Sequence, residues 1–305
     1  MNADIIVFGS IAHDLISYTE KLPRPGETIT GISFEASPGG KGANQAIQAA
    51  RLGAKIGDDI FGEFCVKNLE QSGIMVDFIE KSTTARTATA TIIVSTSENM
   101  IVITLGANLE MKADRAVQLY QLIASAKIIL CQNEIDNNAT KMALEIAKKN
   151  NVKTFLNFAP CTPTFDKDML KNVDILCVNE IEAESLSGRQ VMNTDDALME
   201  AESFLNLGPS MAIITLGAQG AIIAHRDDKK IIRKFHVEAF QVNANDTTGA
   251  GDSFCGALAY FFVKMPHLSL EEQLRRTTLV ASISVQRKGT QKSYPWASEI
   301  PEAIE

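Results

Sequence analysis

The chain has 305 residues, of which 45% are hydrophobic, enough to bury a substantial core in one large domain or two of ordinary size. Its 29 Lys and Arg against 37 Asp and Glu give a net charge of −8, which offers no basic surface for nucleic acid or an anionic membrane. The five cysteines are scattered without a CxxC pair, so neither a disulfide framework nor a zinc site is indicated. The first residues do not resemble a signal peptide, and no stretch approaches the roughly 18 apolar residues of a membrane span. We therefore expect a soluble protein of the cytoplasm, with the nucleus as the alternative compartment.

Short apolar runs alternate with helical patterns along most of the chain, which is typical of βα units around a mainly parallel sheet. We predict a first strand at 5–9 and a helix at 43–52 that ends before Gly53. Further strands are predicted at 127–132, 152–157, 174–178, 211–215 and 221–224, with helices around MALEIAKKN and from Asn193 onward. The pattern predicts a doubly wound, mainly parallel α/β sheet in a single domain over 1–305.

Two segments break this alternation. Residues 15–36 and 87–106 are each predicted to form two strands, with the polar turns PRPGE and Ser97–Asn99 between them. Both segments flank the stretch GGKGAN, so we interpret them as a small β layer outside the main sheet that acts as a lid. The alternative is that they extend the edge of the main sheet, and the pattern does not decide between the two.

The stretch NDTTGAGDSF (245–254) comes directly before an apolar segment with helical spacing. Its small residues at 249–251 allow backbone N–H groups to approach a ligand, and the helix expected from Ser253 onward adds the positive end of its dipole. This arrangement suits a phosphate or an oxyanion, with the carboxylate of Asp252 beside it. The alternative is that Asp252 caps the helix and the glycines only turn the chain.

The stretch SPGGKGANQ (37–45) has three glycines in four positions before a helix, with Lys41 among them and Asn44 one turn later. It is not a Walker A loop, because Lys41 is not followed by Ser or Thr and the required upstream glycine is missing. Close backbone approach, together with the donors and the acceptor of these two side chains, suits a neutral polyol. The alternative is a helix-starting turn with a solvated lysine.

Together these stretches resemble the two signature regions of the ribokinase-like (PfkB) carbohydrate kinase family, GGKGANQA and DTTGAGDSFCGAL, in the family's order. The resemblance extends along nearly the whole chain, through GSIAHDL, PGET, GANL, CQNEI, NFAP, VNEIEAE, ITLGAQG and RKGTQKSYPW. It implies a Rossmann-like three-layer fold with a β-sheet lid. It also implies ATP-dependent phosphorylation of D-ribose at its 5-hydroxyl, with ribose and ATP as partners and a homodimer formed through the lids.

The resemblance implies a role for each matching position. Asp252 corresponds to the catalytic base, and the anion hole corresponds to the backbone of Gly249, Ala250 and Gly251. The positions that hold the sugar, together with Asp252, are Asp14, Gly40, Lys41, Asn44 and Glu134. The positions that bind Mg-ATP, with Mg²⁺ as a cofactor, are Asn179, Glu182, Thr215, Gly217, Gly220 and Thr278. The site of an activating monovalent cation, usually K⁺, comprises Asp246, Thr248, Ser284, Arg287, Gly289 and Ser293.

These roles compete with simpler interpretations and with departures from the family pattern. Without the resemblance, Asp14, Glu134 and Glu182 would be interpreted as an ordinary turn residue, a strand-end charge and an exposed helix acid. Thr278 stands near the adenine site where the family often has Asn, and Ala12 stands where a polar sugar contact is common.

The largest departure follows the first signature. Family members usually have an apolar strand between the GGKGAN helix and a turn like GDDIFG, whereas here Ala54 is followed by Lys55 and at once by IGDD. Roughly half a dozen residues, about one short strand, are missing by this comparison. We therefore expect a lost core strand and a weakened fold, with a variant transcript or a gene-model error as the alternative explanation of the short segment. Three activities follow: a D-ribose kinase, another sugar or nucleoside kinase of the family, and a catalytically impaired sugar-binding homologue.

Overall fold

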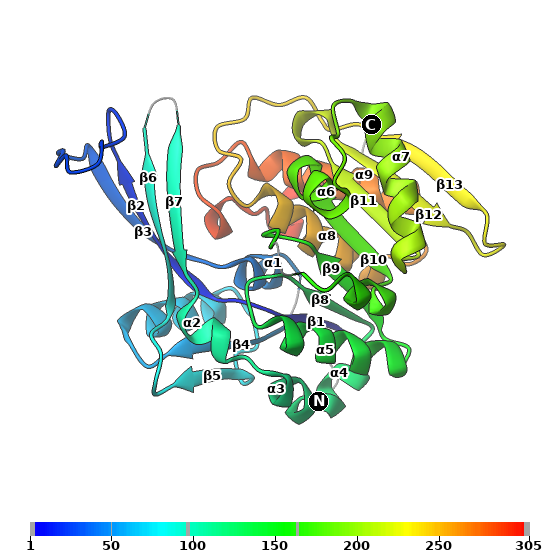
Figure 1. Ribbon diagram of the computed structural model, residues 1–305, viewed down its shortest axis with the longest axis horizontal. Helices are drawn as coiled ribbons and strands as arrows, with labels where there is room; N and C mark the ends of the chain where they lie inside the picture. Colours follow the sequence, from blue (N-terminus) through cyan, green and yellow to red (C-terminus); the bar gives the residue numbers. More distant parts are fainter. Residues whose placement is uncertain (1–3, 50, 96–97, 163–164, 302–305) are drawn as a thin grey trace.

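The computed structural model describes residues 4–49, 51–95, 98–162 and 165–301, which are arranged around two β-sheets (Figure 1). The large sheet has nine strands in the order β13-β12-β11-β10-β9-β8-β1-β4-β5, and the small sheet has four in the order β3-β2-β6-β7. The seven strands from β5 to β11 along the large sheet run parallel, while β12 and β13 are each antiparallel to the preceding strand. The predicted fold class is confirmed.

The strands of the large sheet are short, and the central ones come mainly from apolar runs. Their bounds are β1 Ile5–Phe8, β4 Arg51–Gly57, β5 Ile79–Ser82, β8 Ile128–Cys131, β9 Lys153–Asn157, β10 Ile175–Asn179, β11 Met211–Thr215, β12 Ala221–Arg226 and β13 Ile232–Val237. The strands predicted at 5–9, 127–132, 152–157, 174–178, 211–215 and 221–224 are therefore confirmed within two residues at each end.

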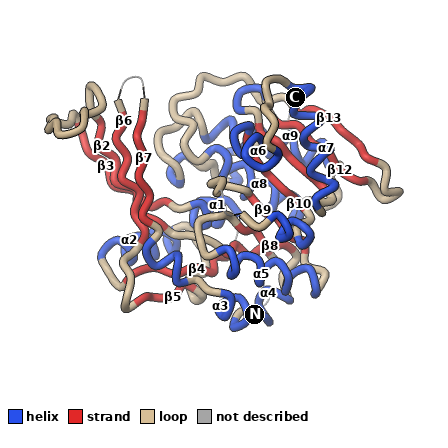
Figure 2. The backbone as a smooth tube through the Cα atoms, viewed as in Figure 1, coloured by secondary structure: helices blue, strands red, loops and turns tan. Residues whose placement is uncertain are grey.

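Helices cover both faces of the large sheet (Figure 2). One face carries α1 Lys41–Ala49, α2 Ile60–Gln71, α8 Ala250–Lys264 and α9 Leu270–Ser284. The opposite face carries α3 Ala113–Gln118, α4 Tyr120–Ala124, α5 Asn137–Lys149, α6 Glu180–Ser187 and α7 Thr194–Phe204. Short 3₁₀ helices are η1 Gly106–Glu110, η2 Lys167–Asn172, η3 Leu205–Leu207, η4 Gly217–Gln219, η5 Gln291–Ser293 and η6 Ala297–Glu299. Within the described ranges, none of the helices combines the length and the apolar character that crossing a bilayer requires.

The alternation of side chains along the central strand explains the two layers of core. Ile5 and Val7 of β1 pack with the α1, α2, α8 and α9 side, while Ile6 and Phe8 pack with the α3 to α7 side. Successive residues of a strand point to opposite faces, so a strand with helices on both sides must be apolar throughout. The strand ends of this central region carry the polar side chains of the candidate site.

The strand that the sequence comparison predicts to be missing is present. Helix α1 ends at Ala49, and β4 follows from Arg51 to Gly57. β4 pairs in parallel with β1 on one side and with β5 on the other, and Ala54 and Ile56 are fully buried. The prediction of a lost strand is wrong because Arg51 and Leu52, which the helical spacing assigns to the preceding helix, extend together with Gly53 beside β1. Tertiary pairing outweighs local helix propensity here.

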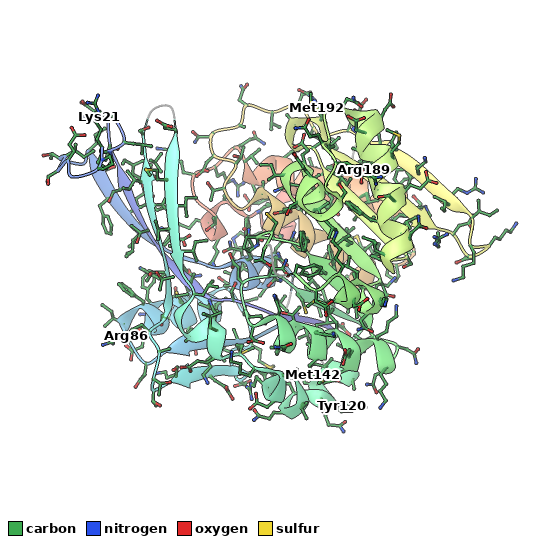
Figure 3. The ribbon with its side chains drawn as sticks, in the orientation of Figure 1. Lys21, Arg86, Tyr120, Met142, Arg189 and Met192 are labelled. Carbon is green, nitrogen blue, oxygen red and sulfur yellow. The ribbon has the colours of Figure 1, made fainter. Side chains whose placement is uncertain are left out.

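The small sheet stands apart from the large one, at the left of Figure 1. It contains β2 Ala12–Tyr18, β3 Ser33–Gly39, β6 Ala88–Val94 and β7 Asn99–Thr104. The alternative that these segments extend the main sheet is therefore wrong. β2 begins three residues before the predicted segment and β3 continues into the glycine-rich stretch, while residue 97 of the predicted second turn lies outside the described residues. Lys21 lies near the free end of the small sheet and Arg86 near its other end (Figure 3).

Candidate active site

The carboxylate of Asp252 lies where α1 meets the first turn of α8. Gly249 caps α8 with a φ of 76°, and the helix begins at Ala250, three residues before the predicted start. Asp252 is only 6% exposed. Asn44 Nδ2 donates to its Oδ2 at 2.9 Å, and Gln45 Nε2 donates to its Oδ1 at 2.9 Å. The two signature stretches, which are far apart in the sequence, are thus joined through this one carboxylate.

The turn before α1 is packed tightly against the junction of β1 and β2. Gly40 has a φ of 89°, and a Cβ added there would lie 2.6 Å from the backbone nitrogen of Ala12. A Cβ on Gly39 would collide with the carboxylate of Asp14. The backbone therefore approaches Asp14 as closely as the absence of side chains allows.

Glu134 closes the same cluster from the end of the large sheet. Its Oε2 accepts hydrogen bonds from Ser10 Oγ at 2.6 Å and from the backbone N–H of Lys41 at 2.9 Å. The buried side chains of Asp14, Asn44, Glu134 and Asp252, together with Lys41, surround one small region. All the predicted sugar-binding residues are therefore brought together.

The charges in this region strongly affect one another. Burial, followed by the neighbouring carboxylates of Glu134 and Asp252, raises the pKa of Asp14 to about 7. Burial also raises the pKa of Glu134, although Lys41 opposes this. For Lys41, burial acts to lower the pKa, but the carboxylates of Asp252, Glu134 and Glu182 outweigh it, so the pKa lies above its ordinary value. The region is thus a cluster of carboxylates around one positively charged group, the ammonium of Lys41.

Two cavities adjoin this region. A polar cavity of about 170 Å³ is bordered by Lys41 and Asp252, and also by Asn157, Asn179, Glu182, Thr215, Gly249 and Gly251. A second, mainly apolar cavity of about 220 Å³ is lined by residues of the β11 end, of α8 and α9 and of the loop 239–247. Thr215 and Gly251 line both cavities, so the two meet beside the first turn of α8.

The predicted nucleotide-binding residues divide between the two cavities. Thr215, Gly217, Gly220 and Thr278 line the apolar cavity. Asn179 and Glu182 line the polar one, where they also form the capping box of α6: Asn179 Oδ1 accepts from the Glu182 N–H at 2.8 Å, and the Asn179 N–H donates to Glu182 Oε2 at 2.9 Å. Glu182 is buried, and this burial raises its pKa, so it is not the exposed helix acid of the simpler interpretation.

The residues predicted for a monovalent cation lie in two segments that contact each other, the turn before α8 and the stretch from the end of α9 to η5. Asp246 Oδ1 accepts from the Thr248 N–H at 2.9 Å, its Oδ2 accepts from the Gly289 N–H at 2.9 Å, and its own N–H donates to the carbonyl of Val285 at 3.0 Å. The Arg287 guanidinium pairs with Glu299, at 2.6 Å between the closest atoms. The hydroxyls of Ser284 and Ser293 each donate to a backbone carbonyl. Asp246 therefore braces the turn before α8 against the segment after α9.

Among the described residues, no three His, Cys, Asp or Glu side chains are placed to hold a metal ion together. The oxygen atoms described at Asp246 are those of its own carboxylate and the backbone carbonyl of Val285. Such oxygens suit a hard cation and not a transition metal.

Three polar residues of this region were missed in the sequence. Gln45 and Asn157 are buried and joined to each other by a hydrogen bond of 3.1 Å, and Ser10 connects Glu134 to α1. A detectable signal existed for two of them. Gln45 is a polar residue on the buried face of α1, and Asn157 is the polar end of the apolar strand β9.

Residues 2–297 match the family described as pfkB family carbohydrate kinase. The chain belongs to this family. The resemblance predicted from the two signature stretches is therefore confirmed, and it covers the large sheet, the small sheet and both cavities.

The pfkB relatives include enzymes for two pentoses. The chain is 42% identical to ribokinase of Mus musculus, over 99% of this chain and 95% of the relative. It is 36% identical to deoxyribokinase of Salmonella typhi, over 99% and 98%. Its fold is similar to that of Arabidopsis thaliana ribokinase complexed with ribose and ATP, with a TM-score of 0.88, 27% identity and 98% of each chain covered.

Proposed function

We propose that the protein transfers the γ-phosphoryl group of ATP to the 5-hydroxyl of D-ribose, giving ribose 5-phosphate and ADP. The position of Asp252 carries this proposal. Its carboxylate contacts the polar cluster around Asn44 on one side and borders the polar cavity on the other. A sugar hydroxyl beside Asn44 and a phosphate in the polar cavity would therefore lie next to each other, on either side of the Asp252 carboxylate at the start of α8. The similarity to ribokinase of Mus musculus supports ribose as the sugar.

On the sugar side, Asp14, Asn44 and Glu134 offer acceptors and a donor for hydroxyl groups, while Gly40 allows the backbone to lie close. Each hydroxyl both donates and accepts, so a mixed set of carboxylates, an amide and an ammonium suits a free polyol. On the nucleotide side, the apolar cavity suits the adenine ring, with Thr215, Gly217, Gly220 and Thr278 around it. The phosphates would extend past Thr215 and Gly251 into the polar cavity.

The chemical step is an in-line displacement at phosphorus. The sugar oxygen forms a bond to the γ-phosphorus, the bond to the ADP oxygen breaks, and Asp252 accepts the hydroxyl proton. The backbone of residues 249–251 forms the start of α8, where helical N–H groups point toward an anion, and we assign the anion hole to these residues. Gly249 and Gly251 border the polar cavity, while the N–H of Ala250 donates to the carbonyl of Thr247 at 3.2 Å and would have to exchange this partner for the phosphate. Lys41 adds positive charge beside the transferred group. Positioning and charge stabilisation contribute most to this reaction class, and a carboxylate suffices as the base.

Two ions complete the proposal. Mg²⁺ bound with ATP would neutralise charge on its phosphates, and Glu182 with Asn179, at the edge of the polar cavity, are the residues that would face it. The pKa of Glu182 is raised by burial, which a nearby divalent cation would reverse. A monovalent cation, K⁺ in first place, would be held by Asp246 and Thr248 with oxygens of Ser284, Arg287, Gly289 and Ser293, and would stiffen the turn before α8.

The small sheet is proposed as a lid over the sugar. β2 carries Asp14 and continues directly from the β1 end, so movement of the small sheet would move one wall of the sugar site. Exclusion of water by such a lid limits hydrolysis of ATP. Apolar side chains are exposed on and beside this sheet, namely Ile32, Phe34, Met100, Ile101, Val102 and Ile103. They support the proposal that two lids pair in a homodimer.

Measurement of ADP release with ribose, deoxyribose, fructose and adenosine tests the substrate. We expect the highest kcat/KM with ribose. A higher value with deoxyribose would make deoxyribose the substrate, in line with the name of the Salmonella typhi relative. Asp252→Asn keeps the shape of the side chain but removes the base, and we expect kcat to fall by about 10³-fold or more. Retention of ribose binding by calorimetry shows that the variant is folded. An Asp252→Asn enzyme with wild-type turnover would exclude Asp252 as the base.

A further inference from the structure

Gln45 is fully buried, and every polar atom of its side chain has a partner. Its Nε2 donates to Asp252 Oδ1 at 2.9 Å and to Asn157 Oδ1 at 3.1 Å, while its Oε1 accepts from Gln132 Nε2 at 2.7 Å. The proposed base is thus linked through one amide to the ends of β8 and β9. No other polar side chain described at the site connects α1, α8 and two strands of the large sheet in this way.

The orientation of these amides follows from the carboxylate. An ionised carboxylate only accepts hydrogen bonds, so the atom of Gln45 that faces Asp252 must be the N–H₂ group. Its Oε1 must then face Gln132, which in turn must present its own N–H₂ group. Gln132 Oε1 is left buried without a hydrogen-bond partner among the described residues. A buried oxygen without a hydrogen bond lowers the stability of the fold. The hydrogen bonds from Gln132 to Gln45 and from Gln45 to Asp252 are therefore kept although they leave Gln132 Oε1 unpaired.

The two oxygens of Asp252 differ in their surroundings. Oδ2 is bound by Asn44, which is 5% exposed and belongs to the proposed sugar site, while Oδ1 is bound by Gln45, which is 0% exposed. Asn44 is itself held by Gln291, whose Nε2 donates to Asn44 Oδ1 at 2.9 Å. A sugar hydroxyl can therefore compete for Oδ2 but cannot reach the partner of Oδ1.

We propose that Gln45 is a positioning residue for the base, with Gln132 behind it. It anchors Oδ1 of Asp252 so that Oδ2 points to the sugar hydroxyl that is phosphorylated. This inference rests on the proposed function, because it assigns a role relative to Asp252 as the base. A base anchored on one oxygen loses little orientational freedom when the substrate binds, and misplacement of a catalytic group by about 1 Å can cost about 100-fold in rate.

Gln45→Met tests this role, because methionine has a similar length but cannot donate. We expect kcat to fall by roughly 10- to 100-fold, as for the loss of a hydrogen bond to a charged group, while the ribose dissociation constant changes by less than about threefold. Gln45→Glu keeps an acceptor for Gln132 but directs a carboxylate at Asp252. We expect it to be slower than Gln45→Met, whereas a purely packing role predicts the reverse.

Gln48→Met is the matched control, since Gln48 lies one turn later on α1 and accepts from Ser253 Oγ of α8 at 3.2 Å without contacting Asp252. We expect the kcat of Gln48→Met to stay within about twofold of the wild-type value, because Gln48 is only partly buried. Gln132→Met leaves Gln45 and Asp252 in place, and we expect a smaller fall in kcat, about 3- to 10-fold. It serves as the second test should Gln45→Met not fold.

The outcomes separate the two proposals. One outcome overturns the positioning role and leaves the proposed function intact. In it, Asp252→Asn is inactive, while Gln45→Met and Gln132→Met both keep the kcat of the wild type. A fall in ribose affinity equal to the fall in kcat would also overturn it, because an anchored base acts on turnover. A wild-type enzyme that releases no ADP with any sugar would instead overturn the proposed function.

Discussion

The two glycine-rich turns of the site look alike in sequence, but their glycines serve different purposes. In the turn at 39–42, a Cβ on Gly40 would lie 2.6 Å from the backbone of Ala12, and one on Gly42 would lie 2.6 Å from the carbonyl oxygen of Ser10. In the turn at 249–251, a Cβ on Gly251 would find no atom within 4 Å among the described residues. Gly249 of the same turn is packed, since a Cβ there would lie 2.7 Å from the hydroxyl of Tyr294. The first turn is thus filled by the protein itself, whereas the second leaves space at Gly251, beside both cavities.

This difference shows that a glycine-rich signature alone does not reveal a ligand site. Glycines that admit the protein's own backbone fix the position of α1, and thereby of Lys41 and Asn44. A glycine that faces open space leaves room for another molecule. Substitution by alanine distinguishes the two cases. The added methyl group should lower the stability of the fold in the first case and weaken ligand binding in the second.

The largest effect is expected for Gly42→Ala. Its methyl group would meet the backbone of residues 9 and 10, and neither α1 nor β1 can move without disturbing the core. We expect the free energy of unfolding to fall by about 3 kcal/mol or more, as for severe overpacking. Thermal unfolding measures this. Gly73→Ala is the control, since Gly73 has a positive φ of 75° but no neighbour within 4 Å in the described ranges, and about 1 kcal/mol is expected there. Equal melting temperatures for both variants would remove the distinction drawn above.

Gly251→Ala should show the opposite pattern. Alanine is the better helix former by about 1 kcal/mol, so the melting temperature should stay constant or rise. The methyl group would stand between the two cavities, where the phosphates are proposed to pass, and we expect kcat/KM for ATP to fall by roughly 100-fold. Steady-state kinetics with varied ATP checks this. Full activity would mean that this open space is not part of the phosphate path.

A smaller effect, dependent on pH, is expected for Asp14→Asn. The pKa of Asp14 is raised from 3.8 to about 7 in the folded protein, so its contribution to stability is fully present below pH 3.8 and is lost as the pH rises through about 7. Asparagine does not titrate. We therefore expect the variant to have a higher melting temperature than the wild type at about pH 8, and this advantage to be much smaller at about pH 5.

The same substitution removes a charged acceptor from the proposed sugar site. We expect ribose affinity at about pH 8 to fall by roughly tenfold. In the wild type, ribose binding should weaken as the pH falls below about 7, because Asp14 becomes protonated. Calorimetric titration at two pH values measures both effects, and a wild-type affinity independent of pH would contradict the assignment of Asp14.

Much of the fold follows from local patterns. The apolar runs predict strands such as β11, and the helix predicted from Asn193 onward is α7, which Asn193 caps by accepting from the Asp196 N–H. The end of α1 was not predictable in this way, because RLG has helical spacing and becomes a strand only through pairing with β1. Local propensity cannot report a partner that lies more than 40 positions earlier.

The site was predictable in part for a related reason. Asn44 and Asp252 stand out in the two glycine-rich stretches, the resemblance assigns their roles, and they are joined by a hydrogen bond across 208 positions. The polar character of Gln45 on the buried face of α1 marks it only as unusual, since its role depends on the orientation of Gln132 and on the place where β9 ends. Directional hydrogen bonds between distant elements are set by the packed structure, and no window of the sequence contains them.

The short passage from α1 to β4 has a consequence for how chains of this kind can vary in length. Lys41, Asn44 and Gln45 lie in the first half of α1, while the passage between Ala49 and Arg51 is at its other end, about 13 Å along a nine-residue helix. A change in chain length at this joint is therefore separated from Lys41 and Asn44 by most of the length of α1. We expect chains that differ in length there to keep the same arrangement of these side chains around Asp252.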